Sequence, residues 1–318
     1  MRFAIGLTLG ALVMGCAGHT TVAPTTPPVG PFEGSLAELV PDDVHEVLLL
    51  QPSTLLTTSS TTILVDAVTP APWRRALGDR TGVYAEDVSE LLLARWDDGA
   101  WWALVRVPNA NEVVRGSEVR MAPVELRSDE PFVRRVGFLG NERHELVALT
   151  PDLLLVARGR AGQVVQLLQA LRDPRARAES RPPTWLDSSD APAALVLPHP
   201  LNLPLETPIG LLLARQTALR MELRPRGGAI ELCVRIEGEL PDGAEANFRA
   251  LFEALAASDL GRALGLPDAT PTLRFRTLVA GLEMRADLSP DAIASGIHLL
   301  FRAEIAEIVG NVGEGGVP

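Results

Sequence analysis

The stretch LRMELRPRGGAIELCVRIE, residues 219–237, alternates apolar and polar side chains on both sides of a Gly-Gly pair. Such alternation predicts two strands, and the pair Gly227-Gly228 between them predicts an antiparallel hairpin. One face of this hairpin is apolar and the other is polar, which is typical of a sheet covered on one side only. The apolar set is Leu219, Met221, Leu223, Leu232, Val234 and Ile236.

Similar patterns flank this stretch. Turns are predicted at Ala280-Gly281 and at Asp98-Gly99, the latter as a two-residue turn that places Trp96 opposite Trp101 and Arg95 opposite Trp102. Apolar residues at helical spacing predict helices over 241–255 and from Ser289 onward. Sheets with one apolar face and helices with one apolar stripe predict an α+β fold, in which amphipathic helices cover one face of an antiparallel sheet.

A short internal repeat suggests that this arrangement occurs twice. Arg75-Ala76-Leu77-Gly78 recurs as Arg262-Ala263-Leu264-Gly265, and each copy precedes a predicted hairpin. A stretch rich in Pro, Arg, Ser and Asp separates the copies and has no apolar period. We therefore expect two related halves, with an N-terminal α+β half at 35–172, a linker at 173–192, a C-terminal α+β half at 193–309 and a flexible tail at 310–318.

The N-terminus has the layout of a secretory signal. Arg2 precedes an apolar run over 3–14 that is shorter than the roughly 20 residues a membrane-spanning helix needs. The residues Leu12-Val13-Met14-Gly15-Cys16 resemble a bacterial lipobox. The resemblance implies a signal peptide at 1–15, removed before Cys16, and a membrane anchor of lipid (diacylglyceryl and palmitate-type acyl chains) on that cysteine. An ordinary signal peptide and a buried helix are the alternatives.

The residues after Cys16 indicate where the protein is held. Ala17, in place of the aspartate that usually retains lipoproteins in the inner membrane, implies the outer membrane of the cell envelope, with the body facing the periplasm or the surface. Residues 16–34 are rich in Thr, Pro and Gly and predict a tether, which spans on the order of 20–40 Å.

Composition excludes several classes of function. The 318 residues are 47% hydrophobic and carry a formal charge of −11, and all 29 basic residues are arginine. An acidic exported chain is a poor nucleic-acid binder, so we expect no nucleic-acid partner. Without lysine the chain has neither a Schiff-base lysine nor a phosphate-loop lysine. We expect no cofactor and no metal.

After cleavage Cys233 has no internal cysteine partner, so no internal disulfide can form and the core alone stabilises the fold.

Three of the five tryptophans lie in one predicted hairpin, which makes it the candidate binding surface. Its residues are Arg95, Trp96, Trp101 and Trp102. Exposed rings there would stack on a sugar, a peptide or a protein partner. The alternative is ordinary cross-strand packing, with Trp96 against Trp101 in the core and Trp102 covered by Arg95 or by a helix.

Other polar groups are weaker candidates. The cluster Glu142-Arg143-His144-Glu145 beside a turn predicts a solvated hairpin end, with a metal or general-base role as the alternative. Cys233 belongs to the polar set of its strand and is expected to be partly exposed and passive. No catalytic residue is identified.

The sequence therefore favours a lipid-anchored envelope lipoprotein that binds or scaffolds an envelope protein or polymer and is not an enzyme. One alternative is an envelope hydrolase whose carboxylates assemble in space. Another is a carrier of an apolar ligand, held between sheet and helices.

Overall fold

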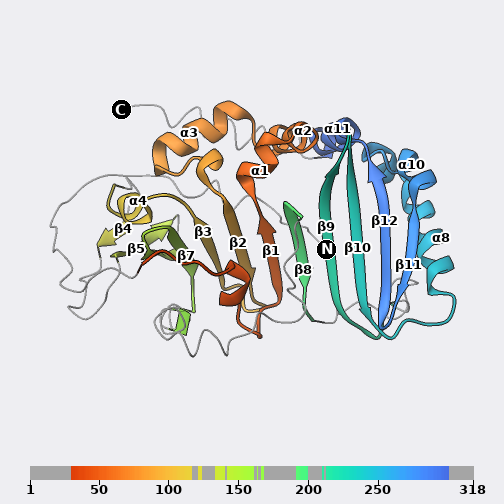
Figure 1. The fold of residues 1–318 in the computed structure, drawn as a ribbon, viewed down its shortest axis with the longest axis horizontal. Coiled ribbons are helices and arrows are strands. Elements are labelled where there is room, and N and C mark those ends of the chain that lie inside the picture. Colours follow the sequence, from red (N-terminus) through yellow and green to blue (C-terminus); the bar gives the residue numbers. More distant parts are fainter. Residues whose placement is uncertain are drawn as a thin grey trace. The chain divides into compact units, whose positions relative to one another are not determined.

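The computed structural model describes residues 30–116, 121–123, 133–139, 142–160, 163, 166–167, 191–199, 210 and 213–300. The predicted signal peptide, Cys16, the tail and most of the tether and linker lie outside these residues. The fold is mixed helix and strand, and each strand pair whose register is given below is antiparallel (Figure 1). Within the described part, no helix combines the length and the hydropathy that crossing a membrane requires.

The chain divides into two compact units. Unit 1 takes its described residues from Met1–Val44, Leu50–Ser53 and Pro72–Ser188, and unit 2 takes them from His45–Leu49, Thr54–Ala71 and Ser189–Pro318. Residues 45–49 and 54–71 thus group with unit 2, whereas their place in the sequence assigned them to the N-terminal half. Whether the two halves are related stays a prediction.

Unit 1 is built around a sheet with the strand order β2-β3-β7-β6-β5-β4. Its strands are β2 (Glu90–Arg95), β3 (Trp101–Arg106), β4 (Met121–Pro123), β5 (Val133–Leu139), β6 (Glu142–Thr150) and β7 (Leu153–Arg158). Its helices are η1 (Leu36–Leu39), α3 (Ala71–Thr81), η2 (Ala85–Asp87) and α4 (Ala110–Gly116).

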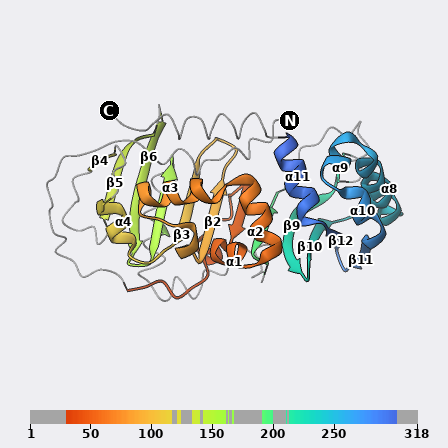
Figure 2. The same cartoon turned by 90° about the horizontal axis from the view of Figure 1, so that it is seen from above.

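The core of unit 1 lies on both faces of β7. Val114 of α4 packs with Leu146, Leu154 and Val156 on one face, and Figure 2 shows α4 beside β5 and β6. All five residues of Leu153–Ala157 are nevertheless buried. The expectation that only one face of the sheet is buried is therefore wrong for this strand. Its unbroken apolar run is the pattern of a strand that is buried on both sides.

Unit 2 contains a second strand series, β11-β12-β10-β9-β8-β1. Its strands are β1 (Glu46–Leu50), β8 (Ala193–Leu197), β9 (Gln216–Arg226), β10 (Ala229–Gly238), β11 (Arg274–Leu278) and β12 (Gly281–Leu288). Its helices are α1 (Pro52–Thr57), α2 (Ser59–Val68), α8 (Ala244–Ala257), α9 (Asp259–Ala263), α10 (Leu266–Ala269), η4 (Thr270–Thr272) and α11 (Pro290–Leu300).

The predicted hairpin at 219–237 is confirmed. β9 and β10 pair with Leu223 opposite Leu232 and Leu219 opposite Ile236, on either side of Gly227-Gly228. Helices α8 and α10 cover the apolar face, where Phe248 and Phe252 of α8 pack against residues of β10 and β12. Ser289 accepts a hydrogen bond from the amide of Ala292, which confirms the predicted helix start.

The register predicted for the tryptophan hairpin is wrong. Arg95 lies opposite Trp101, and Ala94 lies opposite Trp102. The amide of Trp96 donates to the carbonyl of Ala100, so three residues form the turn instead of two. Gly99 closes this turn at φ +80°, a conformation that glycine adopts without strain. The extra residue shifts every pair and places Trp96 on the same face as Trp102.

The last residues of the predicted tether are fastened to unit 1 by an arginine, so they belong to the folded body rather than to a free tether. Arg106 of β3 donates from Nη1 to the carbonyl of Phe32 (2.6 Å) and from Nη2 to that of Gly34 (2.7 Å). Asp152 accepts from the Phe32 amide (3.0 Å) and pairs with Arg106 (2.9 Å). The guanidinium also lies over the Phe32 ring, 5.7 Å from its centroid. These contacts fix the start of the folded body.

Replacing Arg106 with Ala should release this segment. We expect the Phe32 amide to exchange hydrogen roughly thirtyfold faster, because two charge-assisted hydrogen bonds worth on the order of 1 kcal/mol each are lost. Hydrogen exchange read by mass spectrometry measures this. Glu33→Ala, at an exposed side chain of the same segment, is the control and should leave exchange unchanged. Equal exchange in Arg106→Ala and the unmodified protein would show that the segment is held by other contacts.

Candidate functional site

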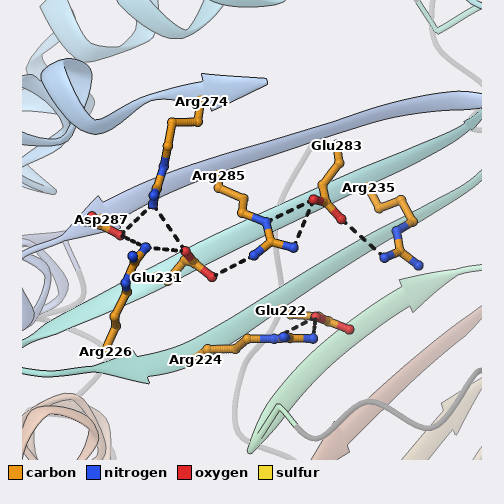
Figure 3. Close-up of polar contacts among 9 residues, drawn as sticks. All are labelled: Glu222, Arg224, Arg226, Glu231, Arg235, Arg274, Glu283, Arg285 and Asp287. Atoms are coloured by element: carbon orange, nitrogen blue, oxygen red, sulfur yellow. Dashed lines mark hydrogen bonds and ion pairs between the residues drawn. The ribbon is translucent and has the colours of Figure 1, made fainter. Parts of the chain in front are cut away.

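The polar face of the unit 2 sheet carries an arginine–carboxylate network. It consists of Arg220, Glu222, Arg224, Arg226, Glu231, Arg235, Arg274, Glu283, Arg285 and Asp287. Side chains alternate across a strand, so the residues that separate the apolar positions of β9, β10 and β12 all project to this second face. Figure 3 shows nine of the ten side chains.

Each carboxylate of the network binds more than one arginine. Glu231 accepts from Arg226 (2.9 Å) and Arg274 (3.2 Å), and both of these arginines also pair with Asp287 (3.7 and 3.3 Å). Arg285 links the two ends, because it donates to Glu231 (3.4 Å) and to Glu283.

The two remaining carboxylates each bind a pair of arginines. Glu283 accepts from Arg285 (2.9 Å) and from Arg235 (3.2 Å). Glu222 lies between Arg220 (2.6 Å) and Arg224 (2.7 Å). Arginine's planar fork allows such shared and bidentate contacts.

The carboxylates lie beneath the guanidiniums. The side chains of Glu222, Glu231 and Glu283 are only 2–8% exposed, whereas those of Arg224, Arg226, Arg235, Arg274 and Arg285 are 36–54% exposed. We name these five side chains the arginine face. Because the acids are covered, a molecule that approaches this face meets positive charge first.

The electrostatics of Glu283 follow from this layering. Burial disfavours the charged carboxylate, but the hydrogen bonds from Arg285 and Arg235 outweigh it, so the pKa of Glu283 lies below its ordinary value of 4.5. The same contacts raise the pKa of Arg285. Glu283 and Arg285 are therefore both charged near neutral pH.

Cys233 lies within the network and is buried rather than partly exposed. In the register it faces Arg285 on one side and Glu222 on the other. Burial, together with the charge of Glu283, raises the pKa of its thiol. A thiol with a raised pKa forms little thiolate and is a weak nucleophile, which agrees with the passive role expected of this cysteine.

The three tryptophans of the candidate surface differ in how far they are buried. Trp96 and Trp102 are buried, with ring centroids 5.8 Å apart, so neither offers an exposed ring face. Trp101 is half-buried against the ring of His144 (5.5 Å), and Arg95 is exposed. Of the four candidate residues, only Trp96 and Trp102 are in ring contact with each other, which is the packing of an interior pair.

A second arginine cluster covers Trp96. Arg160 lies over the Trp96 ring, 4.8 Å from its centroid, and pairs with Asp43 (2.6 Å) and Asp98 (3.0 Å). Asp43 also accepts from the Trp96 indole (3.1 Å). Arg160 holds a positive φ of 48°, which is uncommon outside glycine and persists only where surrounding contacts impose it. This cluster ties the hairpin turn to the end of β7.

The polar cluster at 142–145 lies at the end of the β5–β6 hairpin, as predicted, since Leu139 pairs with Glu142, and Arg143 is exposed, but the cluster is only partly solvated. His144 and Glu145 are both buried, and Glu145 pairs with Arg134 (2.7 Å). Within the described residues, no group of three or more His, Cys, Asp or Glu side chains is arranged to hold a metal ion. Glu231 and Asp287 do converge, but each is bound by the guanidiniums of Arg226 and Arg274.

Sequence reasoning missed the arginine face. The alternation in 219–237 predicted a polar face, yet four of the ten network residues come from β11 and β12. β12 pairs with β10, and β11 pairs with β12, only in the folded sheet. The signal that was available is the run Glu283-Met284-Arg285-Ala286-Asp287, in which acids and an arginine alternate with apolar residues. Together with the alternation in 219–237, this run indicates that the strand over 283–287 has a polar face like that of the β9–β10 hairpin.

No protein-family profile matches the sequence, and no curated protein matches it either. Among solved structures, three crystal forms of TP0453 are similar. Forms IV, III and I have TM-scores of 0.48, 0.48 and 0.47 and sequence identities of 12%, 11% and 13%. The alignments cover 86%, 86% and 84% of this chain and 97%, 98% and 98% of TP0453. At this identity and TM-score, the similarity supports no statement about function.

Proposed function

We propose that this chain is a lipid-anchored lipoprotein of the bacterial cell envelope that binds or scaffolds another envelope component and is not an enzyme. The anchor is taken from the lipobox-like sequence that ends at Cys16, and the outer-membrane location from Ala17. The observation that carries the binding role is the arginine face, in which half-exposed guanidiniums lie over buried carboxylates.

Preorganisation makes this face suited to binding. A free arginine side chain loses conformational entropy when a partner immobilises it, and this loss weakens binding. The arginines of this face are already held by Glu222, Glu231 and Glu283. A partner therefore meets donors whose positions are fixed before it arrives.

Anchorage strengthens such binding. A body held by a tether of tens of ångströms samples a small volume next to the membrane, so its effective concentration toward other envelope components is high. The contacts of Arg106 with Phe32 and Gly34 support this arrangement, because they join the end of the predicted tether firmly to unit 1.

The anchor is tested by replacing Cys16 with Ala in the full-length chain, expressed in a bacterium that processes lipoproteins. The unmodified protein should incorporate labelled palmitate and sediment with membranes, whereas Cys16→Ala should lose the label and move to the soluble fraction. Cys233→Ala is the matched control and should behave as the unmodified protein, because the Cys233 side chain is buried. Retention of Cys16→Ala in the membrane fraction would contradict the anchor.

A further inference from the structure

The arginine face has a local charge opposite to that of the chain. Six guanidiniums against four carboxylates give the described network a formal charge of +2, within a chain whose formal charge is −11. Three of the four carboxylates are almost inaccessible, so the exposed layer is more positive than this balance indicates. This local charge favours an anionic partner.

The guanidiniums retain hydrogen-bond donors. Each has five N–H groups, and the described contacts occupy Nη1 of Arg226, Nη2 of Arg235 and Nη2 of Arg274. Nε of Arg235 is buried and has no hydrogen-bond partner among the described residues.

The donors form a row rather than a pocket. The network follows β10 and β12 from the Glu231–Asp287 pair, through the Cys233–Arg285 pair, to the Arg235–Glu283 pair. Residues two apart on one face of a strand are about 6.7 Å apart, so these three levels span about 13 Å. Arg226 and Arg274 lie at one end, Arg285 lies in the middle and Arg235 lies at the other end (Figure 3).

We propose that the arginine face binds a linear polyanion whose repeating groups are phosphates, with its chain running along β10 and β12. Arginine's fork matches the oxygen pairs of phosphate, and a row of guanidiniums favours a chain of charges over a single small anion. A bilayer surface would instead engage charges spread over a plane. The inference names the partner chemistry of the proposed binding role and rests on that role.

The test uses the full mature chain, purified with its lipid in neutral detergent, and a short inorganic polyphosphate as the probe. Calorimetric titration should show polyphosphate binding at least tenfold more tightly than orthophosphate. Binding should weaken as salt rises, because each guanidinium–phosphate contact releases counterions. Equal affinity for the two anions, or no binding of polyphosphate, would overturn the inference.

Variants locate the site. The double variant Arg226→Gln with Arg235→Gln should weaken polyphosphate binding roughly ten- to thirtyfold and lower the slope of log affinity against log salt by about 2, one unit for each lost contact. It leaves Glu231 with Arg274 and Arg285, and Glu283 with Arg285. Arg262→Gln, which removes the same charge from an exposed site on α9, should bind as the unmodified protein.

A second measurement does not depend on the variants folding. In the unmodified protein, polyphosphate should protect Arg226, Arg235 and Arg274 from phenylglyoxal, with the modified sites read by mass spectrometry, while Arg262 stays reactive. Modification that is unchanged by polyphosphate would contradict the inference.

Two further outcomes distinguish failure of the polyanion inference from failure of the proposed lipid anchor. If phosphatidylglycerol vesicles bind through Arg226 and Arg235 while polyphosphate does not, the face recognises a membrane and the inference is wrong, although the binding role stands. If Cys16 carries no lipid while polyphosphate binds, the proposed anchor fails and the polyanion site stands.

Discussion

Replacing Trp102 with Ala is expected to lower the free energy of unfolding of unit 1 by about 3–5 kcal/mol. Trp102 is 2% exposed and lies between Ala94 of β2 and Ala157 of β7, whose small side chains make room for the indole. The substitution removes a large buried ring, its contact with Trp96 and the hydrogen bond from its indole to Gln163 (3.1 Å). Because its two cross-strand partners are alanines, these cannot fill the cavity.

Urea unfolding followed by circular dichroism measures this loss. Arg95→Ala, at an exposed position of the same hairpin, is the control and should change the free energy of unfolding by less than about 1 kcal/mol. Trp102→Phe separates the ring from the hydrogen bond, and it should recover most of the loss. A change below about 1 kcal/mol for Trp102→Ala would contradict the burial of this side chain.

Replacing Arg285 with Ala is expected to destabilise unit 2 by about 1–3 kcal/mol near neutral pH. The variant leaves Glu283, 2% exposed, with Arg235 as its remaining described partner, and it also breaks the link to Glu231. Removal of one partner leaves a buried carboxylate poorly satisfied, which costs more than the pair contributed. Arg276→Ala, at an exposed side chain of β11, should change stability by less than about 0.5 kcal/mol.

The effect of Arg285→Ala should depend on pH with a defined sign. The folded pKa of Glu283 lies below its ordinary value of 4.5, so this group stabilises the fold above about pH 4.5 and the contribution is lost as pH falls through the folded pKa. The difference between Arg285→Ala and the unmodified protein should therefore shrink below about pH 4.5. Urea unfolding at several pH values measures it, and a difference that grows on acidification would contradict the role assigned to Glu283.

The elements of unit 2 could be predicted because their patterns are local. The alternation in 219–237, the glycine turn and the cap at Ser289 each lie within a short stretch, and the structure has all three. The register at Asp98-Gly99 could not be predicted, because the same residues fit a turn of two or three residues. The choice depends on contacts such as Arg160 with Asp98, which join residues far apart in the chain.

The arginine face could be predicted only in part, for the same reason. The sequence indicates that Arg224, Glu231 and Arg235 share a polar face, but it does not show that the glutamates are buried beneath the arginines. That burial arises when β11 and β12 add Arg274, Glu283 and Arg285 beside β10. Likewise, residues 45–49 group with unit 2 through pairings across more than a hundred residues, which no local pattern encodes.

The proposed function depends most on the state of Cys16. Mass spectrometry of the native protein, taken from its own envelope and digested, reads the N-terminal peptide directly. We expect a peptide that begins at Cys16 and carries a diacylglyceryl group on sulfur. A peptide that retains residues 1–15 and an unmodified Cys16 thiol would contradict it.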